Sequence, residues 1–171
     1  NYFNLIYILI LFIIIYPLET RNKVFLLDAM ALIYRAHFAF SKNPIMNSKG
    51  MNTSPIYGFL NTLIELIRKE EPTHLAVVFD TKAPTFRSEI FVDYKANRER
   101  QPEDIQISIP FIKKILQLLS IKILEKDGFE ADDVIGSLAT QLASDADTVI
   151  YMMTPDKDFA QLVSKNIFLY K

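Results

Sequence analysis

The sequence contains no cysteine, and it has only four glycines and two histidines among its 171 residues. Without cysteine the chain has no disulfide, no thiolate metal ligand and no cysteine nucleophile, and we expect it to be cytoplasmic because that compartment is reducing. None of the glycines at positions 50, 58, 128 and 136 stands in a G-x-G-x-x-G or P-loop pattern. We therefore expect no nucleotide cofactor of the usual kinds.

The sequence also has no excess of positive or negative residues. Nineteen Lys and Arg residues are balanced by twenty Asp and Glu residues, which gives a formal net charge of -1. No broad positive field is present, so a nucleic-acid partner would have to be held by a local basic patch. Half of the residues are hydrophobic, which is enough for one domain with a substantial core.

The first sixteen residues differ from the remainder of the chain. From Tyr2 to Tyr16 the one clearly polar side chain is Asn4, and the run ends before Pro17. About 15 helical residues span about 22 Å, short of a hydrocarbon core about 30 Å thick, so a membrane span is marginal. No Lys or Arg precedes the run, which argues against a secretory signal. The chain begins with Asn rather than Met, so we expect residues 1–22 to be a hydrophobic extension outside the domain. A real anchor or an added strand is the alternative.

From Lys23 onward, strand and helix signals alternate. Short apolar runs predict buried strands at residues 24–27, 74–79, 121–124, 148–153 and 167–170. Apolar residues at helical spacing predict helices at residues 29–40, 54–69, 105–119 and 130–143. The alternation predicts an α/β fold over residues 23–171, with a mainly parallel central sheet and helices on both faces.

Two prolines bear on the predicted helices. The helix at residues 54–69 opens at Thr53-Ser54-Pro55, where a hydroxyl cap precedes a first-turn proline. Pro110 lies inside the apolar pattern at residues 105–119. We expect it to divide that stretch into a short helix and a longer one that starts near Ser108.

Seven acidic side chains stand just after strands or at the start of a helix. The set is Asp28, Asp80, Glu130, Asp132, Asp133, Asp156 and Asp158. Strand ends of one polarity lie along one edge of a parallel sheet, so we expect these side chains to converge. Crowded carboxylates raise one another's pKa unless cations neutralise them, and clustered oxygen ligands suit Mg²⁺ or Mn²⁺.

Each acidic element also has a purely structural explanation. Acids in the first turn of a helix interact favourably with its dipole, and a single Asp after a strand is a common turn former. Asp156 and Asp158 could cap a helix of their own. Acids after three separate strands and at one helix start would nevertheless need several unrelated coincidences. Their joint placement therefore favours a divalent-metal site.

The polar stretch at residues 86–100 interleaves cations with aromatic side chains. The cations are Arg87, Lys95, Arg98 and Arg100, and the aromatic residues are Phe86, Phe91 and Tyr94. If the stretch is helical, Arg87, Tyr94 and Arg98 lie near one face. Cations can hold phosphate oxygens while Tyr94 offers a stacking surface for a base. The alternative is a solvated helix with charge pairs, and the neighbouring acids favour the phosphate clamp.

Five runs resemble the 5' nuclease domain of bacterial DNA polymerase I, which belongs to the flap endonuclease family. In the order of the family they are FLLDAMALIYRAHFA, VVFD, FR followed by YKANR, GFEADDVIG and DKDFAQL. The resemblance extends from Val24 to Lys171. It implies a 5'-3' exonuclease and flap endonuclease, which hydrolyses phosphodiester bonds near a 5' end or flap of branched or nicked duplex DNA, as in primer removal and repair. It also implies two Mg²⁺ ions, with Mn²⁺ as a substitute, and we expect a monomer away from membranes.

The resemblance also implies a role for each site residue. The first metal site would consist of Asp28, Asp80, Glu130, Asp132 and Asp133, and part of the second would consist of Asp156 and Asp158. The residues facing the scissile phosphate would be Arg87, Lys95 and Arg98. The DNA contacts would come from Arg35, Tyr94 and Arg100. Residue patterns without the resemblance indicate only a divalent-metal phosphoesterase with a mixed basic and aromatic surface.

Two departures from the family pattern qualify these expectations. Pro155 stands where many relatives have glycine, although both following acids are in place. Family members continue past the position of Lys171 into further ligands of the second metal and a helix-three-turn-helix that grips duplex DNA. We therefore expect a catalytic core without a complete catalytic site, and one alternative is a non-catalytic DNA-binding fragment that is inactive alone. A PIN-type ribonuclease is another, although it would not be expected to carry the long segment at residues 81–101.

Overall fold

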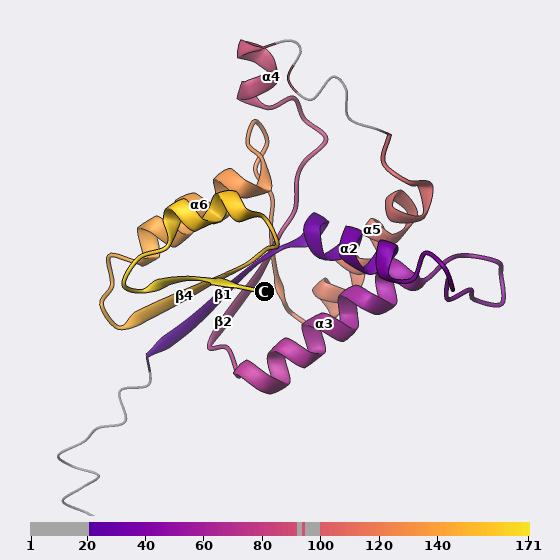
Figure 1. Ribbon diagram of the computed structural model, residues 1–171, viewed down its shortest axis with the longest axis horizontal. Helices are drawn as coiled ribbons and strands as arrows, with labels where there is room; N and C mark the ends of the chain where they lie inside the picture. Colours follow the sequence, from indigo (N-terminus) through magenta and orange to yellow (C-terminus); the bar gives the residue numbers. More distant parts are fainter. Residues whose placement is uncertain (1–20, 92–93, 95–99) are drawn as a thin grey trace, which may run out of the picture.

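A five-stranded parallel sheet forms the centre of the computed structural model, which describes residues 21–91, 94 and 100–171 (Figure 1). The strands are β1 (Asn22–Asp28), β2 (His74–Val78), β3 (Lys122–Leu124), β4 (Thr148–Met153) and β5 (Ile167–Tyr170). Their order is β3-β2-β1-β4-β5, and each neighbouring pair is parallel. In the central strand, Leu27 pairs with Val77 on one side and with Met153 on the other. Continuous apolar runs suit strands that are covered on both faces.

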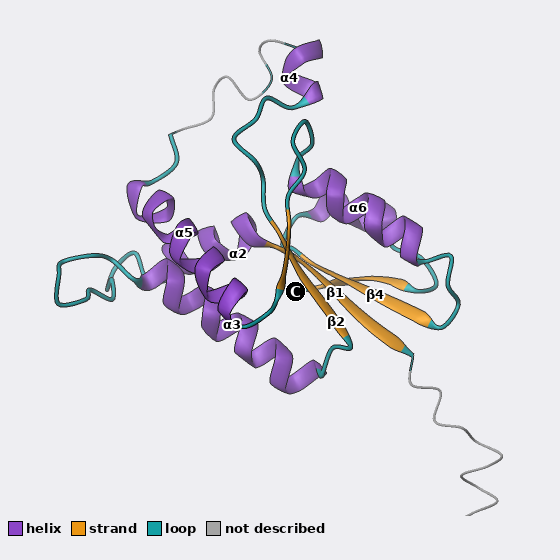
Figure 2. Cartoon of the chain, turned by 180° about the vertical axis from the view of Figure 1, so that it is seen from behind, coloured by secondary structure: helices purple, strands orange, loops and turns teal. Residues whose placement is uncertain are grey.

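Helices cover both faces of this sheet (Figure 2). They are α2 (Ala29–Ala39), α3 (Ser54–Glu70), α4 (Phe86–Ile90), α5 (Glu103–Leu118), α6 (Ala131–Leu142) and the 3₁₀ helix η1 (Lys157–Leu162). The helices α2, α3 and α5 lie on one side, and α6 lies on the other. The predicted α/β class with a mainly parallel sheet and helices on both faces is confirmed.

The two faces of β1 contribute to two separate cores, because successive side chains of a strand point in opposite directions. Phe25 and Leu27 are fully buried against α2, α3 and α5. Val24 and Leu26 point to the opposite face, where Ile135 of α6 and Phe159 of η1 pack. The strand is therefore packed on both faces. This packing fixes the position of Asp28, which directly follows the last apolar residue of the strand.

The helix α5 corrects the prediction that Pro110 divides the stretch. The structure has one helix from Glu103 to Leu118 with the proline inside it. Ile105 lies before the proline and Ile112 after it, and both are fully buried. Burying such a side chain contributes roughly 1.5–3 kcal/mol, so the two together offset the cost of about 3 kcal/mol for an interior proline. Pro110 is exposed, and so is Gln106, whose carbonyl would otherwise accept the hydrogen bond that proline cannot donate.

The start of α3 confirms the predicted boundary but not the predicted cap. The helix begins at Ser54 with Pro55 in its first turn. Thr53 occupies the cap position, yet its side chain makes no capping hydrogen bond. Its hydroxyl instead donates to the carbonyl of Ile45 at 2.9 Å, which ties the start of the helix to the preceding loop.

The segment after β2 does not form one helix from residue 86 to 100. The helix α4 ends at Ile90, and Phe91 adopts an extended backbone with φ -133° and ψ 101°. Arg87 and Tyr94 therefore do not share a face of one continuous helix. Lys95 and Arg98 lie outside the described residues.

The predicted hydrophobic run at residues 2–16 also lies outside the described residues, so the extension at residues 1–22 stays a prediction. The described part of the chain opens with Arg21, and β1 begins at Asn22. Within this described part, no helix has the length and apolar character needed to cross a membrane.

Candidate functional site

Asp28 is the acid that the sheet holds most tightly. It is the last residue of the central strand and also the residue that caps α2, and it is 7% exposed. One carboxylate oxygen accepts the backbone N–H of Ala31 at 3.0 Å, and the other accepts the hydroxyl of Thr154 at 3.1 Å. Its position thus follows from the sheet, and its orientation follows from two donors on different elements.

Asp80 connects the end of β2 to the start of α6. The residue is exposed, and its carboxylate accepts the backbone N–H of Ala131 at 2.8 Å. Glu130 directly precedes α6 at its cap position and is 8% exposed. Asp132 and Asp133 lie in the first turn of that helix. The helix start is thereby brought to the same edge of the sheet as the acids that follow the strands.

The turn after β4 adds the last two acids. Asp156 caps η1, and its carboxylate accepts the backbone N–H of Asp158 at 2.9 Å. The backbone N–H of Asp156 donates in turn to the hydroxyl of Thr154 at 3.2 Å. The capping role considered from the sequence is thus present, and it leaves both acids at the edge of the sheet.

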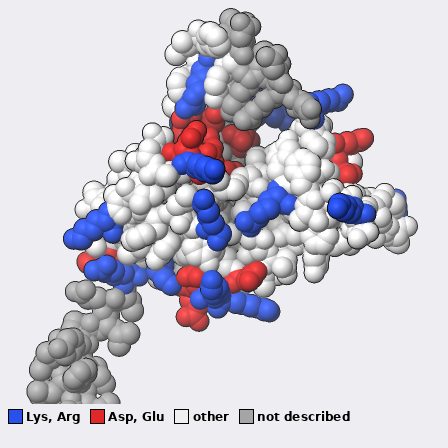
Figure 3. Space-filling model, viewed as in Figure 1, with Lys and Arg blue, Asp and Glu red and all other residues white. Residues whose placement is uncertain are grey.

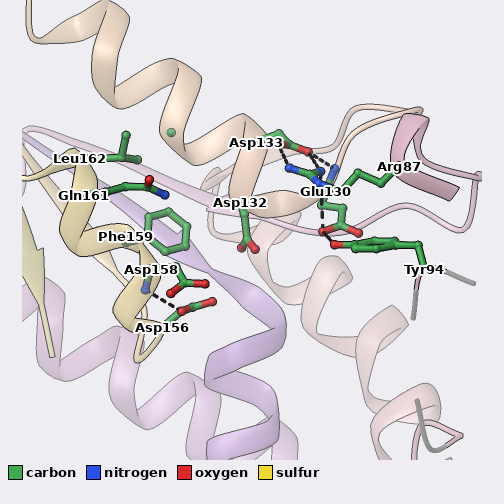
Figure 4. A pocket seen from close by; sticks show the side chains of 11 residues that line it. Arg87, Tyr94, Glu130, Asp132, Asp133, Asp156, Asp158, Phe159, Gln161 and Leu162 are labelled. Carbon is green, nitrogen blue, oxygen red and sulfur yellow. Dashed lines mark hydrogen bonds and ion pairs between the residues drawn. The ribbon is translucent and has the colours of Figure 1, made fainter. Parts of the chain in front are cut away.

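Two neighbouring cavities bring the seven acids together. One, of about 440 Å³, is lined by the acids Glu130, Asp132, Asp133, Asp156 and Asp158. The other, of about 400 Å³, is lined by Asp28, Asp80, Glu130, Asp132 and Asp156. Figure 3 shows a patch of acidic side chains below α4. Within the first cavity, Asp132 lies between the turn that holds Asp156 and the group formed by Glu130, Tyr94 and Arg87 (Figure 4). We call these two cavities the acid pocket.

The acids of this pocket influence one another's protonation. Partial burial, together with the negative charges of Asp28, Asp80, Asp156 and Glu130, raises the pKa of Asp132 to about 6. Burial also raises the pKa of Asp28, against the hydrogen bonds from Ala31 and Thr154 that lower it. Such shifts arise where carboxylates are partly buried and lie close to other negative charges.

Among the described residues, Arg87 is a cation that pairs directly with the acid pocket. The guanidinium of Arg87 donates to both oxygens of Asp133, at 2.6 and 2.7 Å. The same group lies 3.9 Å from a carboxylate oxygen of Glu130. Tyr94, predicted to face a base, donates its hydroxyl to Glu130 at 3.3 Å. Both residues thus lie at the acid pocket, and their predicted contacts with phosphate and base stay predictions.

The acids suit a hard divalent cation by their chemistry, because all of them offer carboxylate oxygens. Their convergence and the raised pKa of Asp132 favour a positive charge at this position. Among the residues that the structure describes, however, no three acidic or histidine side chains are arranged as a ready set of ligands for one ion. Side-chain rotation would therefore have to accompany binding, and the assignment of the seven acids as ligands stays a prediction.

The remaining predicted residues either lie away from the acid pocket or belong to the part of the chain that the structure does not describe. Arg35 is exposed on α2 and lines a separate cavity of about 210 Å³ with Lys69 and Tyr170. Arg100 is exposed and is not among the residues lining the acid pocket. Lys95 and Arg98 fall in the part of the chain that is not described.

The structure adds a residue that sequence reasoning missed. Thr154 is 1% exposed and follows β4 directly. Its single hydroxyl donates to Asp28 and accepts from the backbone of Asp156, so it joins the acids that follow two adjacent strands. Its position just after a buried strand is the same signal that identified Asp28, and a search limited to acids overlooked it.

Comparison of this chain with known proteins identifies its family. A sequence model described as "5'-3' exonuclease, N-terminal resolvase-like domain" matches residues 23–171. The chain belongs to this family. The resemblance that the five sequence runs indicated is therefore confirmed.

Named relatives of this exonuclease domain are similar over most of the chain. A 5'-3' exonuclease of Aquifex aeolicus (strain VF5) is 44% identical over 148 residues, which is 86% of this chain and 50% of that protein. DNA polymerase I of Treponema pallidum (strain Nichols) is 39% identical over 150 residues, 88% of this chain and 15% of that protein. The chain thus spans about half the length of the first relative and a much smaller share of the second.

Solved structures agree on the fold of the exonuclease domain. A bacteriophage T5 flap endonuclease in complex with DNA and metal ions has a TM-score of 0.62 at 18% identity, over 86% of this chain and 54% of that one. A T5 5'-exonuclease with bound zinc has a TM-score of 0.59 at 18% identity, over 86% and 55% of the two chains. At this identity the similarity shows a shared architecture.

Proposed function

We propose that this chain is the catalytic core of a divalent-metal-dependent 5'-3' exonuclease and flap endonuclease that acts on DNA. The observation that carries the proposal is the convergence of seven carboxylates, from three strand ends and one helix start, on a single acid pocket. The membership in the exonuclease family and the T5 relative with DNA and metal ions support it.

The acids of this pocket would hold the cations in two groups. Asp28, Asp80 and the acids of the α6 start would hold the first ion, and Asp156 with Asp158 would contribute to the second. Bound divalent ions supply a nucleophile from water and stabilise the departing 3' oxygen of a phosphodiester. Asp28 would bind with little reorganisation, because two donors already orient it. Below about pH 6 Asp132 would lose its proton on binding, since a nearby positive charge offsets the burial and the repulsion that raise its pKa.

Cations beside the acids would handle the substrate. Arg87, Lys95 and Arg98 would offset the charge that grows on the phosphate oxygens. Tyr94 offers a ring against which a base can stack, and Arg35 and Arg100 would contact the DNA backbone farther away. A branched or nicked DNA with a 5' end or flap is the substrate, and the active unit is a monomer.

Cleavage of defined substrates tests this function. A 5'-flap DNA and a single-stranded RNA of the same sequence would be incubated with Mg²⁺ and the protein, alongside Asp132→Ala. We expect the flap DNA alone to be cut, and only by the unmodified protein. Cleavage of the RNA instead would support a PIN-type ribonuclease.

A second arm separates a non-catalytic fragment from a wrong assignment. The chain would be compared with a version extended to the length of its exonuclease relatives, and both would be titrated with Mg²⁺ by calorimetry. Mg²⁺ binding by both, with cleavage by the extended version alone, would identify this chain as a metal-binding core that needs the additional part. Absence of Mg²⁺ binding and of cleavage in both would refute the proposed function.

A further inference from the structure

Arg87 joins α4 to the start of α6 through a two-pronged ion pair. Its two terminal nitrogens donate to the two oxygens of Asp133 at 2.6 and 2.7 Å. One of those oxygens also accepts the backbone N–H of Glu130 at 3.0 Å. Paired, parallel hydrogen bonds of this kind are among the stronger polar contacts in proteins and fix the direction of both groups. Figure 4 shows the guanidinium directed from α4 toward the acids rather than away from them.

The docking of α4 depends heavily on this one side chain. No residue of α4 is buried. Apart from the contacts of Arg87 with Asp133 and Glu130, the described contacts of α4 with other elements are the packing of Phe86 on Phe129 at 5.8 Å and a backbone hydrogen bond from Phe86 to Gly128 at 3.0 Å. Both aromatic rings are more than one third exposed. Such a surface contributes little stability without the ion pair.

The ion pair occupies a carboxylate that a divalent cation would need. Asp133 lines the acid pocket together with Glu130 and Asp132, and both of its oxygens already accept hydrogen bonds from Arg87. A doubly charged ion among these acids would repel a guanidinium that lies 3.9 Å from Glu130. Like charges a few ångströms apart in a partly buried site repel strongly. The guanidinium and the cation therefore compete for the same oxygens.

We propose that Arg87 is the internal counter-ion of the acid pocket and that it leaves Asp133 when a divalent cation binds. The proposal rests on the proposed function, because it assumes that the acids bind such a cation. In the cation-free protein Arg87 neutralises part of the acid pocket and holds α4 against α6. After the cation binds, the guanidinium of Arg87 is available to bind a phosphate. The cation would therefore bind before the phosphate of the substrate.

A distance measurement follows the predicted movement without any catalysis. The chain has no cysteine, so two introduced cysteines can be labelled selectively. The test pair is Ile90→Cys on α4, at a residue 81% exposed, and Gln141→Cys on α6. The control pair is Gln117→Cys on α5 and Gln141→Cys. We expect Mg²⁺ to lengthen and broaden the distances of the test pair and to leave the control pair unchanged.

Two variants separate the ion pair from a general effect of charge. Asp133→Asn keeps the size of the side chain and removes its charge, so the test pair should show the longer distances even without Mg²⁺. Arg87→Lys keeps the positive charge and loses the two-pronged contact. It should bind Mg²⁺ several-fold more tightly in calorimetry, because a weaker competitor for Asp133 remains. Circular dichroism confirms that both variants are folded.

The outcomes distinguish this proposal from the proposed function. Suppose that Mg²⁺ binds, the distances in the test pair stay unchanged and Arg87→Lys has the same Mg²⁺ affinity as the unmodified chain. This result would overturn the proposed exchange of Arg87 for the cation at Asp133, and it would leave the metal-dependent function standing. Absence of Mg²⁺ binding to the unmodified chain would overturn both. Movement of the test pair on Mg²⁺ binding, abolished by Asp133→Asn, is the result that supports the exchange.

Discussion

The acid edge of the sheet and the α4 region hold their functional side chains by different means. Asp28 is built into the central strand, which is buried on both faces and paired on both sides. Arg87 lies on a helix of five residues with no buried member, and its position depends on the acids that it contacts. The packed core positions the acids, and the acids in turn position the guanidinium of Arg87.

This difference separates the rigid part of the site from its responsive part. The backbone positions of the acids that the core fixes should stay the same when charges nearby change, because moving them would disrupt packing. A helix held mainly by one ion pair should respond to salt, cations and substrate, since other ions compete for the paired charges and screen them. The four predictions below compare the two regions, starting with the largest expected effect.

Truncating an aromatic ring should have very different consequences in the two regions. Phe25 is fully buried and stacks on Tyr151 at a centroid distance of 4.6 Å, so Phe25→Ala should lower the free energy of unfolding by about 3–5 kcal/mol. Phe86 is 39% exposed, so Phe86→Ala should cost about 1 kcal/mol or less. Urea unfolding monitored by circular dichroism measures both. Equal losses would show that α4 belongs to the core.

Removing the charge of Asp28 should greatly reduce Mg²⁺-dependent cleavage. Asp28→Asn keeps the oxygen that caps α2, and we expect activity to fall by at least about 100-fold, because a central ligand is lost. The matched control is Asp147→Asn, since Asp147 is an exposed acid just before β4, at the opposite edge of the sheet. Initial rates on flap DNA measure the effect in a version of the protein that cleaves. Similar rates for the two variants would contradict the assignment of Asp28.

Thr154 should support the acid edge without binding metal itself. Thr154→Val removes the hydroxyl that orients Asp28 and accepts from Asp156, and we expect Mg²⁺ affinity to fall by about tenfold. Thr154→Ser retains the hydroxyl and should bind nearly as well as the unmodified chain. Calorimetric titration compares the three proteins. If valine and serine behave alike, the hydroxyl does not orient the ligands.

The raised pKa of Asp132 predicts how stability depends on pH in the absence of divalent cations. The folded protein favours the protonated carboxyl, with a pKa of about 6 against an ordinary value of 3.8. Stability should therefore fall as the pH rises through this window and stay lower above it. The side chain is partly exposed, so after allowance for screening by solvent the loss is about 1 kcal/mol.

A neutral replacement tests this sign directly. In EDTA, Asp132→Asn should be more stable than the unmodified chain at about pH 7.5, and the difference should shrink toward about pH 5. Saturating Mg²⁺ should remove the advantage, because it stabilises only the protein that binds it well. Greater stability of the unmodified chain at the higher pH without Mg²⁺ would show that neighbouring cations already neutralise the acids.

Much of the framework follows from short-range patterns. The apolar runs located all five strands, and Asp28, Asp80 and Asp156 were placed at one edge because parallel strands share a direction. The single helix through Pro110 was missed, because its stability comes from Ile105 and Ile112 packing against distant segments. The role of Thr154 was missed for the same reason, since its hydroxyl meets an acid 126 positions away.

The alternation of strands and helices, the family and the identity of the acids can be read from residues that lie close together along the chain, because apolar periodicity and short motifs are local properties. The pairing of Arg87 with Asp133, the hydroxyl bridge of Thr154 and the elevated pKa of Asp132 arise from folding alone. Each depends on the distance and burial of groups that are remote along the chain, and those quantities exist only once the two cores have packed on the sheet.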